Sequence, residues 1–201
     1  MGLFDALLGK SKVAQPDLGH LFALSSAAVS LQAAENLVST LRAGVCFKSV
    51  DAQSFAAARS EITGLLTLED GTNAAATGDS GVTLHEVTDK YNYNWMVLNG
   101  TDFDTLVTRT HFINSTLDDH GFGPQLLCSV FGFRPAGAIK DSAASTYMVY
   151  LFKQGTFYPF VPQGGERRNN EIELRIKNEL GNELRIEPQL DRWFPMWDLP
   201  L

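Results

Sequence analysis

Few residues in this chain have a type and spacing that suggest chemistry, and the histidines come first among them. They are His20, His85, His111 and His120, and no two of them form a His-x3-His pair of the kind that holds zinc. His111 follows the apolar stripe of an expected helix, where packing or surface exposure explains it better than metal binding. Asp118 and Asp119 precede His120, but a histidine at a helix end is also favoured by the helix dipole, and no third ligand class can be placed nearby. We therefore predict no metal and no cofactor.

The two cysteines, Cys46 and Cys128, both stand in apolar, strand-like runs. Free cysteine is among the most buried residue types, so we expect both thiols to be reduced, buried and slow to react. A disulfide between them is possible in principle, although nothing else in the sequence suggests secretion.

No catalytic motif accompanies these residues. The sequence has no Gly-x-Ser-x-Gly, no phosphate-binding loop ending in Lys-Ser or Lys-Thr, and no dinucleotide fingerprint. We therefore predict no catalytic residues and a protein that is not an enzyme. Because catalytic triads assemble in space rather than in sequence, an unrecognised enzyme stays an alternative.

Composition sets the broad class. A chain of 201 residues with a net charge of −7 is long enough for one domain with a sizeable core. The acidic balance argues against nucleic acid as a partner and against broad attraction to anionic lipid. No run approaches the roughly 20 apolar residues that span a bilayer. The start carries Asp5 and lacks a signal-peptide pattern, so the expected location is the cytoplasm.

Residues 1–16 are predicted to form an amphipathic N-terminal segment. Its apolar face consists of Leu3, Phe4, Leu7 and Leu8, with Lys10 and Lys12 beside it. One hypothesis is weak, reversible contact of this segment with the inner face of the membrane. The alternative is a packed or frayed terminus.

The first half of the remaining chain predicts helices and one strand. Residues 17–42 read as helical in part, although residues 29–31 could be extended, and residues 45–47 read as a strand. Asp51 is a plausible N-cap for a helix. That helix carries Phe55, Ala58, Ile62, Leu65 and Leu66 on one side. Residues 70–81 are small and polar and predict a loop, the one place for a domain boundary. We expect residues 17–201 to form a single domain.

The second half predicts most of a sheet. Residues 82–87 pair as a hairpin with a strand in which Tyr91, Tyr93, Trp95 and Val97 alternate with more polar positions. Thr101 and Asp104 resemble a capping box for a helix that Gly121 ends. Residues 126–133 are apolar on both faces, as in a central strand.

The last third contains an aromatic hairpin over residues 147–162, with its second arm at a sheet edge because Pro159 cannot donate a ladder hydrogen bond. Residues 171–180 alternate like a strand but also carry helical charge pairs. Asn169 or Asn170 as cap and Gly181 as terminator favour the helix. The whole pattern predicts an α+β fold, an antiparallel sheet with helices packed against it.

The aromatic residues of the hairpin and the tail are the candidates for partner binding: Phe157, Tyr158, Phe160, Trp193 and Trp197. Arg167 could form a basic rim beside them, or belong to a polar loop that enters the helix. Neither aromatic set stays in water without cost, so we expect hairpin and tail to pack together and any face left exposed to contact a partner.

Four segments carry a family resemblance: residues 1–9, 121–131, 155–162 and 186–197. Together they resemble PspAB, the PspA-associated protein family. The resemblance implies an accessory role in the phage-shock, or envelope-stress, system and supplies no catalytic residues. The predicted function is therefore a non-enzymatic accessory protein that contacts PspA, or another component of that system, near the membrane. A chaperone-like module that holds peptides or proteins is a second alternative, suggested by the order of elements from residue 82 onward.

Overall fold

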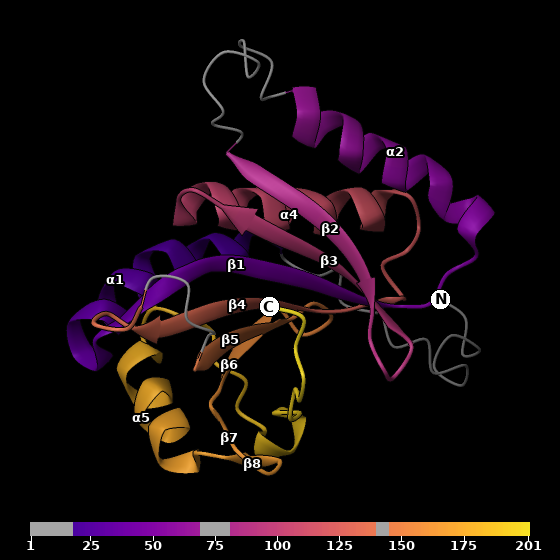
Figure 1. The fold of residues 1–201 in the computed structure, drawn as a ribbon. Coiled ribbons are helices and arrows are strands. Elements are labelled where there is room, and N and C mark those ends of the chain that lie inside the picture. Colours follow the sequence, from indigo (N-terminus) through magenta and orange to yellow (C-terminus); the bar gives the residue numbers. More distant parts are fainter. Residues whose placement is uncertain (1–17, 69–80, 140–144) are drawn as a thin grey trace, which may run out of the picture.

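A computed structural model describes residues 18–68, 81–139 and 145–201. In this part of the chain, helices pack against a six-stranded antiparallel sheet (Figure 1), and the predicted α+β fold is confirmed. In spatial order the strands are β2 (Val82–Thr88), β3 (Tyr93–Gly100), β1 (Leu37–Lys48), β4 (Leu126–Pro135), β5 (Thr146–Leu151) and β6 (Thr156–Phe160). The predicted segment 1–16 lies outside the described residues, as does the predicted loop 70–81 apart from Gly81.

The helices lie before, between and after these strands along the chain. They are the 3₁₀ turn η1 (Leu18–Phe22), α1 (Ala23–Glu35), α2 (Ala52–Leu68), α4 (Phe103–Asp119), α5 (Asn170–Leu180) and the 3₁₀ turn η2 (Leu190–Arg192). A small ribbon of β7 (Pro162–Gln163) and β8 (Arg167–Arg168) connects β6 to α5. β1 precedes residues 69–80 in the chain, and its two neighbours in the sheet, β3 and β4, follow them. The segments before and after residues 69–80 therefore share one sheet.

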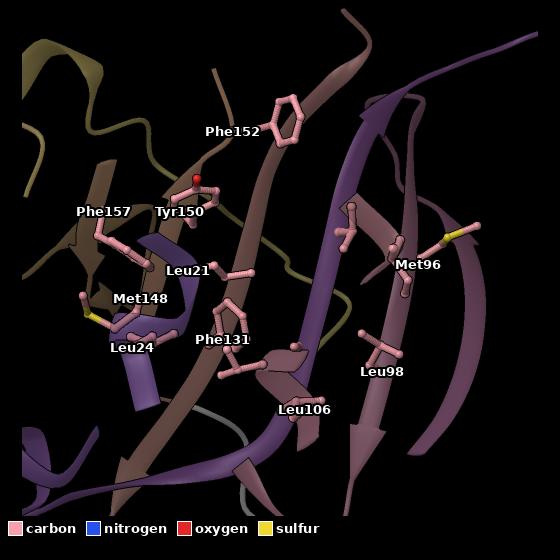
Figure 2. Close-up of a cluster of buried hydrophobic side chains, with 14 of the residues drawn as sticks. Leu21, Leu24, Met96, Leu98, Leu106, Phe131, Met148, Tyr150, Phe152 and Phe157 are labelled. Carbon is pink, nitrogen blue, oxygen red and sulfur yellow. The ribbon is translucent and has the colours of Figure 1, made fainter. Parts of the chain in front are cut away.

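The sheet buries side chains on both faces, in the alternation that a strand imposes. One face packs on helices. Figure 2 shows Phe131, Met148 and Tyr150 of this face near Leu21 of η1 and Leu24 of α1. The opposite face carries a second apolar cluster, in which the described residues from outside the sheet all belong to the C-terminal segment. This tail-covered face is where the candidate site lies.

The N-terminal part needs two corrections. Residues 29–31 lie inside α1, and β1 begins at Leu37, well before the predicted strand at 45–47. The boundary is set by Asn36, whose left-handed backbone (φ 54°) caps α1 and reverses the chain into the sheet. Leu41 also has positive φ, beside a register shift in the β1–β4 ladder, so the strand has the irregularity of a bulge.

The helix starts were predicted with mixed success. Asp51 accepts a hydrogen bond from the Ser54 amide at 2.9 Å, as expected for the start of α2. The predicted capping box at Thr101 is wrong: Asp102, in an extended conformation, caps α4 by accepting from the Thr105 amide at 2.8 Å. Thr101 instead donates its amide to the Gly81 carbonyl at 3.0 Å.

The helix over residues 171–180 is confirmed as α5, and the Asn169 side chain caps it by accepting from the Ile172 amide at 3.2 Å. The expected charge pairs along its surface are replaced by longer-range ones. Arg175 binds Glu35 of α1 through two hydrogen bonds of 2.7 Å, and Glu173 points inward.

The predicted hairpin of β2 and β3 is confirmed, but its burial differs from the expected alternation. From Trp95 to Leu98 β3 is buried on both faces, because Met96 and Leu98 reach the helical side while Trp95 and Val97 reach the other. Tyr91 lies in the turn before the strand. The central position of β4 and its two buried faces agree with the prediction.

Candidate functional site

The C-terminal tail, residues 186–201, lies on the sheet face opposite the helices. The Trp193 ring stacks on Tyr158 with 5.9 Å between centroids, and Trp197 meets the Phe160 ring edge-on at 5.1 Å. The Tyr158 hydroxyl also donates to the Phe194 carbonyl at 2.9 Å. These contacts confirm that the hairpin and the tail form one packed unit.

Backbone pairing fixes the tail beside β6, the last strand of the sheet. The Phe157 amide donates to the Arg185 carbonyl and the Glu187 amide donates to the Phe157 carbonyl, each at 2.8 Å. Further along β6, Pro159 has no N–H to offer, as predicted for an edge strand. The tail therefore covers the start of this edge and then crosses the face (Figure 1).

Arg168 connects the hairpin, α5 and the tail. Its Nε donates to both carboxylate oxygens of Glu173, at 2.8 and 3.0 Å, and its Nη1 donates to the Trp193 carbonyl at 2.5 Å. Its guanidinium carbon lies 5.4 Å from the Phe160 ring centroid. One side chain thus holds three segments together.

Glu173 is 1% exposed and also accepts from the Val161 amide at 2.8 Å. Burial raises the pKa of this carboxyl, while the hydrogen bonds from the Val161 amide and from Arg168 act in the opposite direction. Sequence reasoning selected Arg167 rather than Arg168. The available signal was the spacing of Glu173 with Ile176 and Leu180, which places a carboxylate on the buried face of α5, where it needs a partner.

A cleft of about 440 Å³ opens between the tail and the turn that joins β2 to β3. Its lining includes Cys46, Cys128 and Trp95 from the sheet and Met196 from the tail. Tyr91, Tyr93 and Phe194 also line it and are 52%, 38% and 57% exposed. Size and apolar lining are those of a pocket that accepts a small molecule or the anchor residues of a partner.

Asp89 holds the turn at the mouth of this cleft. Its carboxylate accepts from the Tyr91 and Tyr93 amides at 2.9 and 3.0 Å, and from the Trp95 indole N–H at 2.9 Å. Burial favours the neutral acid, but these hydrogen bonds outweigh it, and the pKa of Asp89 lies below its ordinary value. Lys90 pairs with Asp198 across the mouth and so joins the turn to the tail.

The two cysteines lie at the floor of the cleft as free, buried thiols, as predicted. A hydrogen bond with Cys128, burial, and the neighbouring charges of Cys128 and Asp89 raise the pKa of Cys46. The thiolate, which is the reactive form, is therefore disfavoured. Slow reaction of the thiols in the native protein stays a prediction.

A second, more open groove of about 1120 Å³ lies between α2 and β2. Phe55 and Arg59 line it from the helix, and Leu84 and Val87 from the strand. Arg59 reaches across to Glu86 with an Nε–Oε1 distance of 2.6 Å. The outer edge of β2 pairs with no described strand.

The histidines lie apart in the fold. The His111 ring lies 4.7 Å from that of Phe22, and burial lowers its pKa. His120 contacts Glu61 of α2 at 2.8 Å. Within residues 18–68, 81–139 and 145–201, no three His, Cys, Asp or Glu side chains form a group that could hold a metal ion.

A model of the PspAB family, described as PspA associated protein B, matches residues 1–201. The chain belongs to the PspAB family. The resemblance seen in the sequence is confirmed over the whole chain, and membership links the chain to PspA. No curated protein and no solved structure matches it. None of the described helices is long and apolar enough to cross a bilayer.

The predicted partner-binding residues fall into two groups. Phe157, Tyr158, Phe160 and Trp193 are buried, with Phe157 on the helical side of the sheet, and so their rings offer no surface to a partner in this conformation. Trp197 is half-buried and Arg167 is exposed, with its Nε donating to the Gly164 carbonyl at 3.2 Å. Partner contact through these two stays a prediction. The predicted membrane contacts Leu3, Phe4, Leu7 and Leu8 lie outside the described residues.

Proposed function

We propose that this chain is a non-enzymatic, cytoplasmic accessory protein of the PspA phage-shock system that acts by protein–protein contact near the membrane. Membership of the PspAB family supports the link to PspA. The observation that carries the mechanism is the apolar cleft beside the tail, whose mouth has three exposed aromatic rings. PspA would insert apolar side chains into this cleft.

The distribution of exposed apolar residues supports this surface. Tyr91, Tyr93 and Phe194 come from two segments distant in sequence and line the same cleft. Other exposed apolar side chains, such as Val29 on α1 and Leu174 on α5, belong to elements that do not line it. Aromatic residues clustered around an apolar depression are typical of the energetically important part of a protein interface.

The polar groups of the cleft support a binding role over catalysis. Asp89 is engaged by three hydrogen bonds from its own turn, Lys90 by Asp198, and Lys153 by the Pro124 carbonyl at 2.9 Å. Each of these interactions fixes the structure of the mouth. A general acid or base needs instead to reach a substrate proton.

Phe194→Ala is expected to weaken binding to PspA about thirtyfold or more, because truncating an aromatic hot-spot residue at an interface costs about 2 kcal/mol or more. The measurement is the Kd for purified PspA of the same organism, determined by surface plasmon resonance. Phe22→Ala is the matched control, since Phe22 is also exposed, at 43%, and contacts His111 rather than the cleft. Equal Kd values for wild type and Phe194→Ala would contradict the proposed surface.

Contact with the membrane is expected to depend on residues 2–12. The intact protein should float with anionic liposomes in a density gradient, and a chain that begins at residue 13 should stay at the bottom, because it lacks the apolar stripe of Leu3, Phe4, Leu7 and Leu8. Equal flotation of the two proteins would remove the membrane contact from the proposal and leave the PspA contact to be judged by itself.

A peptide-holding module is the second candidate, and the groove between α2 and β2 favours it. An extended peptide could add to the edge of β2 that pairs with no described strand, while its side chains enter the groove. The same binding experiment separates the two candidates. Binding that survives Phe194→Ala but is lost on Arg59→Glu, which places a second carboxylate opposite Glu86, would assign the contact to the groove.

A further inference from the structure

The two cysteines of the chain lie directly opposite each other in the sheet. Cys46 of β1 and Cys128 of β4 are register partners on adjacent antiparallel strands, and both side chains belong to the tail-covered cluster. They are far apart in sequence, and the chain has no other cysteine. The fold therefore brings the whole thiol content of the protein to one point.

The geometry of neighbouring strands leaves the two thiols close to bonding distance. Residues directly opposite on antiparallel strands have Cα atoms about 4.5–5.5 Å apart, within the roughly 4.4–6.8 Å that a disulfide requires. Their Cβ atoms stand about 4.5–5.5 Å apart, slightly more than the roughly 3.5–4.5 Å of a disulfide. A bond therefore needs a small approach of the strands. The ladder has a register shift between Cys46 and Phe47, so the pairing beside the two cysteines is locally irregular.

We propose that Cys46 and Cys128 form a reversible intramolecular disulfide when a small peroxide enters the cleft. One thiol, as its thiolate, attacks a peroxide oxygen and becomes a sulfenic acid, with release of one water from hydrogen peroxide. The other thiol then attacks that sulfur, the S–O bond breaks, and a second water leaves. In total two thiols and one hydrogen peroxide give one disulfide and two waters. The thiols line the same cleft as the proposed contact with PspA, but the reaction itself does not require PspA.

The surroundings of the pair favour small oxidants over bulky reagents. Both thiols are at most 5% exposed, and the access to them is the cleft, which Met196 and Trp197 of the tail also line. The hydrogen bond with Cys128 and burial raise the pKa of Cys46 and keep its thiolate fraction low, so attack of this thiol on the peroxide is slow. Once a sulfenic acid has formed, its partner thiol is already in contact. The sulfenic acid therefore condenses with the neighbouring thiol rather than with a molecule from solvent.

The same geometry makes the bond reversible. A disulfide that must draw two strands together stores strain and is more easily reduced than an unstrained structural disulfide. A low-molecular-weight thiol reduces it by attack of its thiolate on one sulfur, through a mixed disulfide that a second thiol molecule resolves. The pair is thus suited to cycle between dithiol and disulfide in a reducing compartment.

The test is oxidation of the native full-length protein with hydrogen peroxide, followed by unfolding, alkylation with iodoacetamide and intact-mass measurement. The expected product has lost two hydrogens and both alkylation sites, and excess glutathione restores both. Cys46→Ser and Cys128→Ser should give no such monomeric species. Without peroxide, native wild type should take up iodoacetamide slowly at both thiols, and Trp197→Ala, which opens the tail side of the cleft, should speed both labelling and disulfide formation severalfold.

Three results would overturn the proposal. The first is recovery of both thiols free after peroxide treatment. The second is oxidation of the two cysteines to separate sulfinic acids. The third is a disulfide that forms at the same rate in protein unfolded in urea, because the strand register would then play no part. Circular dichroism of each variant before oxidation shows whether the fold is retained, and Cys46→Ala and Cys128→Ala replace any serine variant that unfolds.

Discussion

Trp193→Ala is expected to lower the free energy of unfolding by about 3–5 kcal/mol, the range for truncation of a buried aromatic side chain. Trp193 is 5% exposed, its ring stacks on Tyr158, and its indole N–H donates to the Glu187 carbonyl at 3.0 Å. Alanine removes the stacking and leaves a buried carbonyl without its donor. Because the tail packs on the apolar cluster formed by β1, β3, β4, β5 and β6, loosening it also exposes the apolar residues beneath.

Urea denaturation followed by circular dichroism measures this effect. Phe194→Ala is the control within the same segment, since Phe194 is 57% exposed and should change the free energy of unfolding by less than about 0.5 kcal/mol. A Trp193→Ala protein of wild-type stability that no longer binds PspA would show that the tail is a docking element and not part of the core. If neither stability nor binding changes, both interpretations of the tail are wrong.

Local signals in the sequence were sufficient for the elements whose determinants lie close together in the chain. Pro159 marked an edge strand, and Asn169 with Gly181 marked the ends of α5, because each acts through its own backbone or through a neighbour three residues away. The packing of hairpin against tail followed from the cost of leaving so many aromatic rings in water. That argument concerns free energy and needs no geometry.

The cleft could not be predicted in this way, because its parts meet only in the sheet. Tyr91 and Tyr93 looked like one face of a strand, whereas Tyr91 lies in the turn that Asp89 holds. Phe194 follows the buried Trp193 directly in the tail, yet it is exposed and lines the cleft. Which aromatic residues of a cluster remain exposed depends on strand order and on the path of the tail, and neither has a local sequence signal.

Errors at element boundaries had a related cause. The helix α1 ends because Asn36 adopts a left-handed conformation, which the sequence does not announce. The strand that follows is stabilised by pairing with β3 and β4, which come much later in the chain. This pairing, together with the weak helix propensity of Val38, Ser39 and Thr40, makes residues 37–42 part of a strand.

Arg168→Leu is expected to lower the free energy of unfolding by about 3–5 kcal/mol near neutral pH, as is typical when one partner of a buried ion pair is removed. The substitution leaves the Glu173 carboxylate 1% exposed with the Val161 amide as its remaining donor among the described contacts. It also removes the donor to the Trp193 carbonyl. Arg167→Leu is the matched control, because that neighbouring arginine is exposed and should cost less than about 0.5 kcal/mol.

The pH dependence of this cost identifies the carboxylate as its source. The pKa of Glu173 in the folded protein lies above its ordinary value of 4.5. Protonation of Glu173 therefore contributes stability that is fully present below pH 4.5 and is lost as the pH rises through the native pKa. Arg168 lowers that pKa, so in Arg168→Leu it rises further and Glu173 stays protonated to a higher pH. The cost of the substitution should therefore be smaller at about pH 5 than at about pH 8. Adding Glu173→Gln should recover much of the loss and remove its pH dependence, since no charge is then left to bury. A cost that is the same at both pH values and is not recovered by Glu173→Gln would show that Arg168 acts instead through its packing on Phe160 and its bond to the tail.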